Sequence, residues 1–70
     1  MRKNAVLPRT IGKKVKKRRT SLGLTQEELA EKVGISRAYM GFVEQGRNVP
    51  TLETLEKIAK ALKIKMAELV

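Results

Sequence analysis

Apolar positions recur along the N-terminal part of the chain with the spacing of an α-helix. The series consists of Leu7, Ile11, Val15 and Leu22. Pro8 suits the first turn of such a helix, because the N–H that proline lacks has no partner there. The pattern predicts a helix over residues 8–21.

A second helix is predicted to begin at a capping box. Thr25 is its N-cap and Glu28 follows three residues later, so that each side chain can accept a hydrogen bond from the other residue's backbone N–H. Gly23 before this helix and Gly34 after it suit tight turns, since glycine readily adopts a positive φ. The expected inner face consists of Leu29, Ala30 and Val33.

A third helix is predicted from Arg37 to about Glu44, with Ser36 as its N-cap. Met40 and Val43 form an apolar stripe with i, i+3 spacing, which leaves the remaining side chains of this helix facing elsewhere. Two short helices joined by a turn at a glycine are typical of the helix-turn-helix motif, whose second helix enters the major groove of DNA.

The rest of the chain is a loop at residues 45–50, a fourth helix that Thr51 opens, and a last helical turn at residues 66–70 with Leu69 as its anchor. The fourth helix has the cleanest apolar face, made of Leu52, Leu55, Ile58, Ala59 and Leu62. We therefore expect an all-α, compact five-helix domain over residues 8–70, preceded by a basic N-terminal tail at residues 1–7.

The charge of the chain points to a polyanionic partner. Sixteen Lys and Arg against seven Glu give a net charge of +9 and a pI near 10.4, so nucleic acid is the first expectation and an anionic membrane the second. A lysine-rich surface that only maintains solubility is the plain alternative. No apolar run approaches the roughly 20 residues of a membrane span, and no signal peptide is recognisable, so we expect a cytoplasmic protein without membrane contact.

The residue types that support catalysis are scarce. The chain has no Cys, no His and no Asp, which removes thiolate metal sites, the usual zinc ligands and the usual general bases. We expect no catalytic residue, no metal site, no cofactor and no small-molecule effector. The sequence therefore predicts a binding protein and not an enzyme.

Many positions match one family in order and spacing: Arg19, residues 22–30, residues 34–36, Val43, Glu44, Gly46, Pro50 and residues 55–62. Through them, residues 9–70 closely resemble the lambda-repressor-like helix-turn-helix family, also called Cro/C1-type or XRE. The resemblance implies a five-helix domain and a sequence-specific transcriptional regulator of double-stranded DNA, with a repressor or autoregulator as the expected form, associated with the nucleoid when bound.

The resemblance also implies which residues meet phosphates. Gln26 and Ser36 stand at helix N-termini, where free N–H groups and the helix dipole favour an anion. Simple capping is the alternative for both. Gln45, Arg47 and Asn48 stand where the family contacts the next phosphates, and an exposed loop is the alternative for these three.

The side chains that would face base edges are Arg37, Ala38 and Phe42, with Tyr39 and Gly41 alongside. A bidentate contact from Arg37 to guanine discriminates against other bases by about 1–3 kcal/mol, whereas a contact to phosphate alone is its alternative. Ala38 and Phe42 suit a thymine methyl group. Phe42 stands where the family often has a polar residue, and packing against the fourth helix is the alternative for its ring.

Two further expectations concern structure and assembly. Arg19 is expected to pair with Glu44 as a structural ion pair. The protein is expected to be a homodimer on a palindromic operator, with candidate interface residues Val49, Met66, Leu69 and Val70. Leu69 has the alternative of closing the core.

Several roles stay open within and outside the family. Controller proteins of restriction-modification systems have a similar recognition helix, with Arg-Thr-Tyr in place of Arg37, Ala38 and Tyr39 and a loop one residue longer. A phage repressor, a host regulator and a DNA-binding antitoxin also fit. A coactivator-like protein-interaction module is the alternative of another class. Arg2, Lys3 and Arg9 form either a minor-groove arm or a mobile tail.

Overall fold

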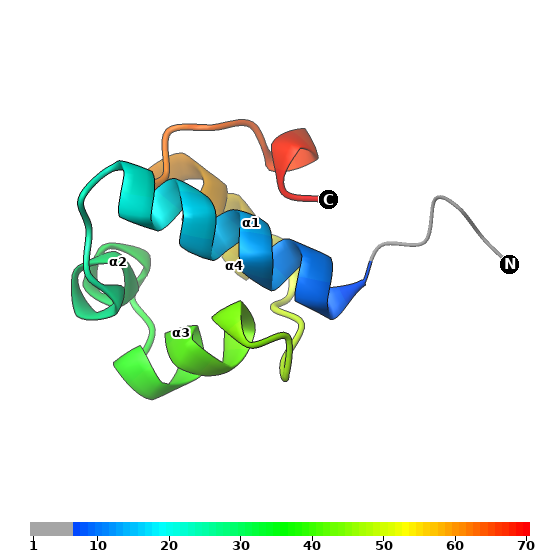
Figure 1. The fold of residues 1–70 in the computed structure, drawn as a ribbon, viewed down its shortest axis with the longest axis horizontal. Helices are drawn as coiled ribbons and strands as arrows, with labels where there is room; N and C mark the ends of the chain where they lie inside the picture. The colour runs from blue at the N-terminus through cyan, green and yellow to red at the C-terminus, as the bar shows by residue number, and fades with distance from the viewer. Residues whose placement is uncertain (1–6) are drawn as a thin grey trace, which may run out of the picture.

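The computed structural model describes residues 7–70, and all regular secondary structure in that range is helical. Its elements are α1 (Pro8–Ser21), α2 (Gln26–Val33), α3 (Arg37–Glu44), α4 (Leu52–Ala61) and the 3-10 helix η1 (Met66–Glu68). Helix α1 runs across the middle of the molecule, with α3 on one side of it and η1 on the other (Figure 1). Arg2 and Lys3 lie outside the described residues, as does all of the predicted basic tail except Leu7.

The all-α class is confirmed, and the helix count differs slightly from the expected five. Residues 7–70 form four α-helices, and in place of the fifth there is a single 3-10 turn in which the Leu69 N–H donates to the Met66 carbonyl at 2.9 Å. Leu69 is fully buried, and only three helical residues precede it, so the segment ends in the core before an α-helical turn is complete. Arg9 lies in the first turn of α1, which excludes it from a flexible arm.

The helix ends agree with the predicted caps. The Glu28 N–H donates to Thr25 Oγ1 at 3.0 Å, and the Thr25 N–H donates to Glu28 Oε1 at 2.8 Å, which completes the capping box. Gly34 has φ +85°, a left-handed conformation that ends α2 and turns the chain into α3. Ser36 Oγ accepts from the Tyr39 N–H and begins α3.

One core joins all five elements. Its fully buried large side chains are Val15 of α1, Leu29 of α2, Met40 and Val43 of α3, Ile58 of α4, Leu62 and Leu69. One predicted inner position is wrong: Leu52 is 67% exposed, because it is the first residue of α4 and lies at the edge of the apolar face. Leu7, the first residue of the apolar series, is exposed and precedes α1 in extended backbone. Within the described residues, no helix is long and apolar enough to cross a membrane.

Two contacts fix α1 to its neighbours. A Cβ added at Gly12 would lie 2.5 Å from the carbonyl oxygens of Val43 and Glu44, so only glycine allows α1 to approach the end of α3 this closely. On another side of α1, Arg18 Nε donates to the Leu62 carbonyl at 2.9 Å, at the C-terminal end of α4. The first contact holds the end of α3 against α1, and the second holds the end of α4 against α1.

Candidate nucleic-acid interface

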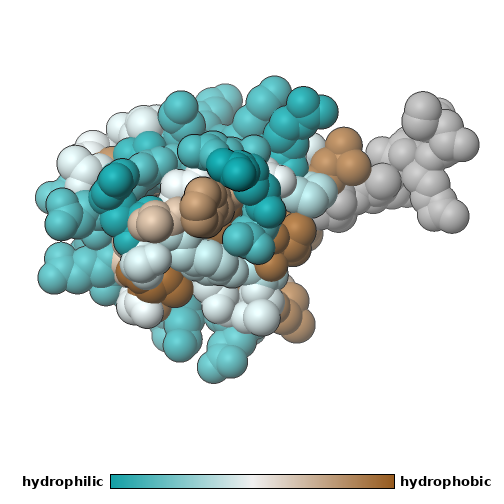
Figure 2. All heavy atoms as spheres, turned by 90° about the horizontal axis from the view of Figure 1, so that it is seen from below, coloured by the Kyte–Doolittle hydropathy of each residue, from teal (hydrophilic) through white to brown (hydrophobic). Residues whose placement is uncertain are grey.

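Helix α3 has a buried face and a free face. Met40 and Val43 are buried in the core, whereas Arg37, Ala38 and Phe42 are exposed and Tyr39 and Gly41 are half-buried. The side of the molecule on which α3 lies is largely hydrophilic, with a few hydrophobic spots among the polar groups (Figure 2). The predicted base-contacting side chains thus share an accessible surface.

The expected ion pair of Arg19 and Glu44 is present behind this surface. Arg19 Nε donates to Glu44 Oε2 at 2.6 Å and Nη2 donates to Oε1 at 3.0 Å, while Nη1 donates to the Leu24 carbonyl at 2.7 Å. Both residues are buried. Because bidentate geometry fixes the angle as well as the distance, the pair holds the C-terminal end of α3 against α1 and the start of α2.

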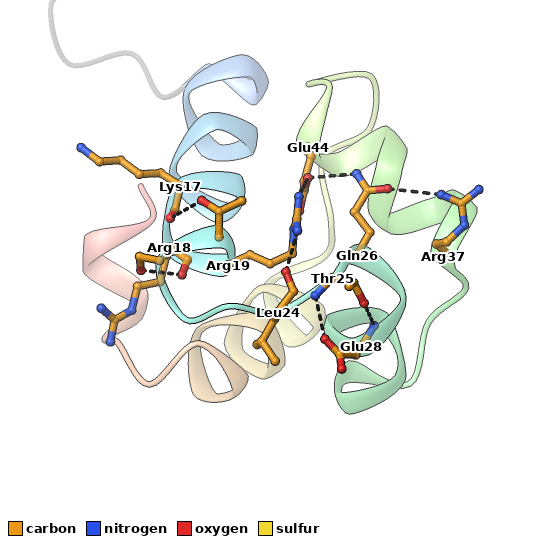
Figure 3. A network of polar contacts seen from close by, with 11 residues as sticks. Lys17, Arg18, Arg19, Leu24, Thr25, Gln26, Glu28, Arg37 and Glu44 are labelled. Carbon is orange, nitrogen blue, oxygen red and sulfur yellow. Dashed lines mark hydrogen bonds and ion pairs between the residues drawn. The ribbon is translucent and has the colours of Figure 1, made fainter.

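The amide of Gln26 extends this network to the exposed face of α3. Its Nε2 donates to Glu44 Oε1 at 3.0 Å, and its Oε1 accepts from Arg37 Nη1 at 3.3 Å (Figure 3). A continuous line of hydrogen bonds therefore runs from buried Arg19 through Glu44 and Gln26 to exposed Arg37. One N–H of Gln26 stays available among the described residues, so its amide can hold Arg37 and still donate to an anion.

Ser36 combines its two predicted roles without conflict. Its Oγ accepts the Tyr39 N–H at 3.0 Å, which is the capping role. The hydroxyl hydrogen is a separate donor, and the side chain is exposed at the N-terminus of α3. Capping and a phosphate contact are therefore compatible at this residue.

Gln45, Arg47 and Asn48 are all exposed in the loop that follows α3. The Arg47 guanidinium lies over the Phe42 ring, 5.1 Å from its centroid. Phe42 is 38% exposed and belongs neither to the core nor to the half-buried hydrophobic side chains that pack against it.

Acids beside this surface come from α2 and not from α3 or its loop: Glu27, Glu28 and Glu31 line a hollow together with Arg37. Residues 37–50 contain a single acid, Glu44, and Arg19 neutralises it. Arg37 and Arg47 therefore have no exposed acid within their own segment. A polyanion approaching α3 meets cations and neutral donors from this stretch of chain.

The candidate residues of the dimer interface differ in how exposed they are. Val49 is 55% exposed in the loop before α4, Val70 is also exposed, and Met66 is half-buried. Leu69 is fully buried in the core, so it closes the core and has no surface to offer a second subunit.

Two glycines to which the sequence analysis assigned no structural role shape the site. Gly12 allows α1 to contact the end of α3, and Gly46 has φ +76° with its Cα so close to α1 that an added Cβ would lie 2.8 Å from the Arg9 Cα. Gly12 could have been noticed, because it lies inside a strong helical pattern. An interior glycine destabilises a helix by about 1 kcal/mol relative to alanine, so its presence there indicates a packing requirement. The contact between Gly46 and Arg9 had no such signal, since 37 positions separate the two residues in the sequence.

The chain is similar to known proteins over most of its length. Residues 15–69 match the helix-turn-helix family model. The immunity repressor protein of Bacillus phage phi105 is 43% identical over 61 residues, which are 87% of this chain and 42% of the repressor, so the chain spans less than half of that relative's length.

Two solved structures extend the comparison to the fold. The restriction-modification controller protein C.AhdI from Aeromonas hydrophila has a TM-score of 0.86 and 38% identity, covering 90% of this chain and 96% of that one. The biofilm master regulator SinR in complex with DNA has a TM-score of 0.80 and 32% identity, covering 84% and 95%.

Proposed function

Because the chain belongs to the helix-turn-helix family of DNA-binding transcriptional regulators, we propose that it binds a palindromic operator as a dimer, with α3 in the major groove. The observation that carries the proposal is the line of hydrogen bonds from Arg19 to Arg37. It gives an exposed arginine on the free face of α3 a defined position before DNA arrives, and a preorganised side chain loses less entropy on binding.

The proposal assigns base contacts to the free face of α3. Arg37 binds guanine O6 and N7, Ala38 lies against a base edge, and Tyr39, Gly41 and Phe42 line the same surface. Phosphate contacts come from Gln26 and Ser36 on one side and from Gln45, Arg47 and Asn48 on the other. These contacts set the register of α3 in the groove, whereas the base contacts select the sequence.

Dimer formation follows from the amount of DNA that one small domain can read. Two copies related by a two-fold axis would read half-sites about 34 Å apart, one turn of the duplex. Val49, Met66 and Val70 are the proposed interface residues. Exposed apolar side chains at Val49 and Val70 support the assignment.

A more specific role as controller of a restriction-modification system is the second candidate. The near-complete coverage of C.AhdI, at 38% identity, favours it. The phage repressor relative favours an immunity repressor instead, but it shares less than half of its length with this chain. Footprinting of the protein on the promoter of its own gene and on that of a neighbouring restriction endonuclease gene separates these roles: protection of both supports a controller, and protection of its own promoter alone supports a repressor.

In either role the protein is proposed to act by binding and not by catalysis, since the chain lacks His, Cys and Asp and the described residues contain no group of three or more potential metal ligands. Selection of bound duplexes from a random library at near-physiological salt tests the function. We expect an enriched palindrome with guanine in each half-site. Absence of enrichment, together with tight binding at low salt, would favour a protein-interaction module.

A further inference from the structure

The contact between Phe42 and Arg47 joins the end of α3 to the loop that follows it. The Arg47 guanidinium carbon lies 5.1 Å from the centroid of the Phe42 ring, within the roughly 6 Å over which the ring quadrupole attracts a cation. Both side chains are exposed. The pair is therefore part of the surface that would meet DNA.

The backbone determines that these two side chains meet. The Arg47 N–H donates to the Phe42 carbonyl at 2.9 Å and the Gly46 N–H donates to the Val43 carbonyl at 3.1 Å, while Gly46 has φ +76°. This is the Schellman arrangement, in which the residue after the glycine typically contacts the residue that accepts its N–H. Because a Cβ at Gly46 would collide with the Arg9 backbone, the turn is restricted to glycine, and Arg47 is directed back over Phe42.

The guanidinium keeps most of its donors free in this position. Among the described residues, its hydrogen bonding is limited to a long contact of 3.5 Å from Nη1 to Gln45 Oε1. Arg19, by comparison, uses three nitrogens on protein acceptors. An aromatic face can therefore orient the Arg47 cation while leaving its N–H groups available for an anion.

From this geometry we propose that Phe42 is a positioning residue: its ring holds the Arg47 guanidinium at the edge of the DNA surface, ready to bind a backbone phosphate. The inference rests on the proposed function and narrows the role of Phe42 within it. Phe42 contributes affinity through Arg47 for any duplex, and it does not select a thymine. The guanidinium lies over one face of the ring, so that face is not open to a thymine methyl group.

The test compares Phe42→Leu, Phe42→Tyr, Arg47→Ala and the double variant Phe42→Leu with Arg47→Ala on one selected duplex and on one random duplex, across salt concentrations. Leucine keeps an apolar side chain but removes the ring, whereas tyrosine keeps the ring. Lys17→Ala is the charge control, because Lys17 is exposed and lines a hollow with Ile64 and with Glu68 of η1. Helix η1 lies across α1 from α3 (Figure 1).

We expect Phe42→Leu to weaken binding by roughly 5- to 30-fold for a dimer on both duplexes and Phe42→Tyr to bind as the wild type does. The slope of the logarithm of the binding constant against the logarithm of the salt concentration should be less steep for Phe42→Leu than for the wild type, and should approach the slope for Arg47→Ala. For one phosphate contact in each of two subunits, the slope changes by at most about 1.8. The base preferences should be unchanged, and Phe42→Leu should have no further effect once Arg47 is alanine.

Two outcomes would overturn the inference while leaving the proposed function intact. One is a changed base preference in Phe42→Leu with an unchanged salt slope, which would make Phe42 a direct reader. The other is an equal loss of affinity from Phe42→Leu with and without Arg47. A wild-type protein that binds neither duplex would overturn the proposed function and the inference together.

Discussion

At the scale of single residues, Glu44 is the acceptor on which the recognition surface depends. It accepts from Arg19 at two oxygens and from Gln26 at one, and its side chain is almost entirely buried. Removing it would leave the buried Arg19 cation without its partner and release Gln26, which orients Arg37. We therefore propose that stability and DNA recognition are linked through this carboxylate.

We predict that Glu44→Ala lowers the free energy of unfolding by about 3–5 kcal/mol, the range for breaking a buried ion pair from one side. Lys16→Ala is the control, because Lys16 is exposed on α1 and its replacement should change stability by less than about 0.5 kcal/mol. Urea unfolding of the two variants measures the difference. Equal midpoints for both would show that the ion pair does not hold α3 in place.

A second prediction at this scale concerns the contact between α1 and α3. Gly12→Ala would place a methyl group 2.5 Å from two backbone carbonyl oxygens, and we expect a loss of about 1–3 kcal/mol as the helices separate. Gly41→Ala is the matched control, since its Cβ would lie 3.9 Å from the nearest atom, Gln26 Oε1, in ordinary contact. Thermal unfolding that ranks Gly41→Ala below Gly12→Ala in stability would contradict this account.

At the scale of helices and turns, the structure agrees with the sequence predictions for features that neighbouring residues determine. The capping box at Thr25, the positive φ of Gly34 and the Ser36 cap depend on residues within three or four positions of one another, so the sequence was sufficient to predict α2, α3 and the turn between them. The same holds for α1, whose bounds at Pro8 and Ser21 match the apolar spacing and the proline.

The features that the sequence could not predict depend on contacts between elements, which are distant in the sequence. Leu52 has the right period for the inner face of α4 but is exposed at its first position. The sequence leaves Leu69 as a candidate interface residue or as a residue that closes the core, and its burial favours the second role. The positioning roles of Gln26 and Phe42 arise from contacts with Glu44, Arg37 and Arg47, which only the packing of α2 against α3 and the turn at Gly46 bring together.

The different environments of Leu52 and Leu55 give a prediction for α4. Leu55→Ala should lower stability by about 2–5 kcal/mol, because it removes buried methyl groups and leaves a cavity, whereas Leu52→Ala should change it by less than about 0.5 kcal/mol. Chemical denaturation of the two variants provides the comparison. A comparable loss from both would place Leu52 in the core, against the structure.

At the scale of the whole molecule, the proposed dimer predicts a concentration-dependent mass. Sedimentation at tens of micromolar should show self-association that Val49→Lys weakens without lowering the thermal midpoint, because Val49 is 55% exposed. Leu7→Lys is the control for adding charge at another exposed apolar position. If wild type and Val49→Lys have the same mass, both alone and on a palindromic duplex, the assignment of Val49 to the interface is wrong.

The whole-molecule account is that core, caps and ion pair together present one helix face to base pairs, with Arg37 in a defined position on it. The most direct test replaces the half-site guanine in the selected operator with 7-deazaguanine, which removes the N7 acceptor and keeps O6. The wild-type protein should lose affinity, by up to about 1–3 kcal/mol per half-site, and Arg37→Ala should bind both duplexes equally. Two results would contradict the claim that α3 reads DNA through this residue. One is an equal loss of affinity for wild type and Arg37→Ala on the modified operator, and the other is selection of the same guanines by Arg37→Ala as by the wild type.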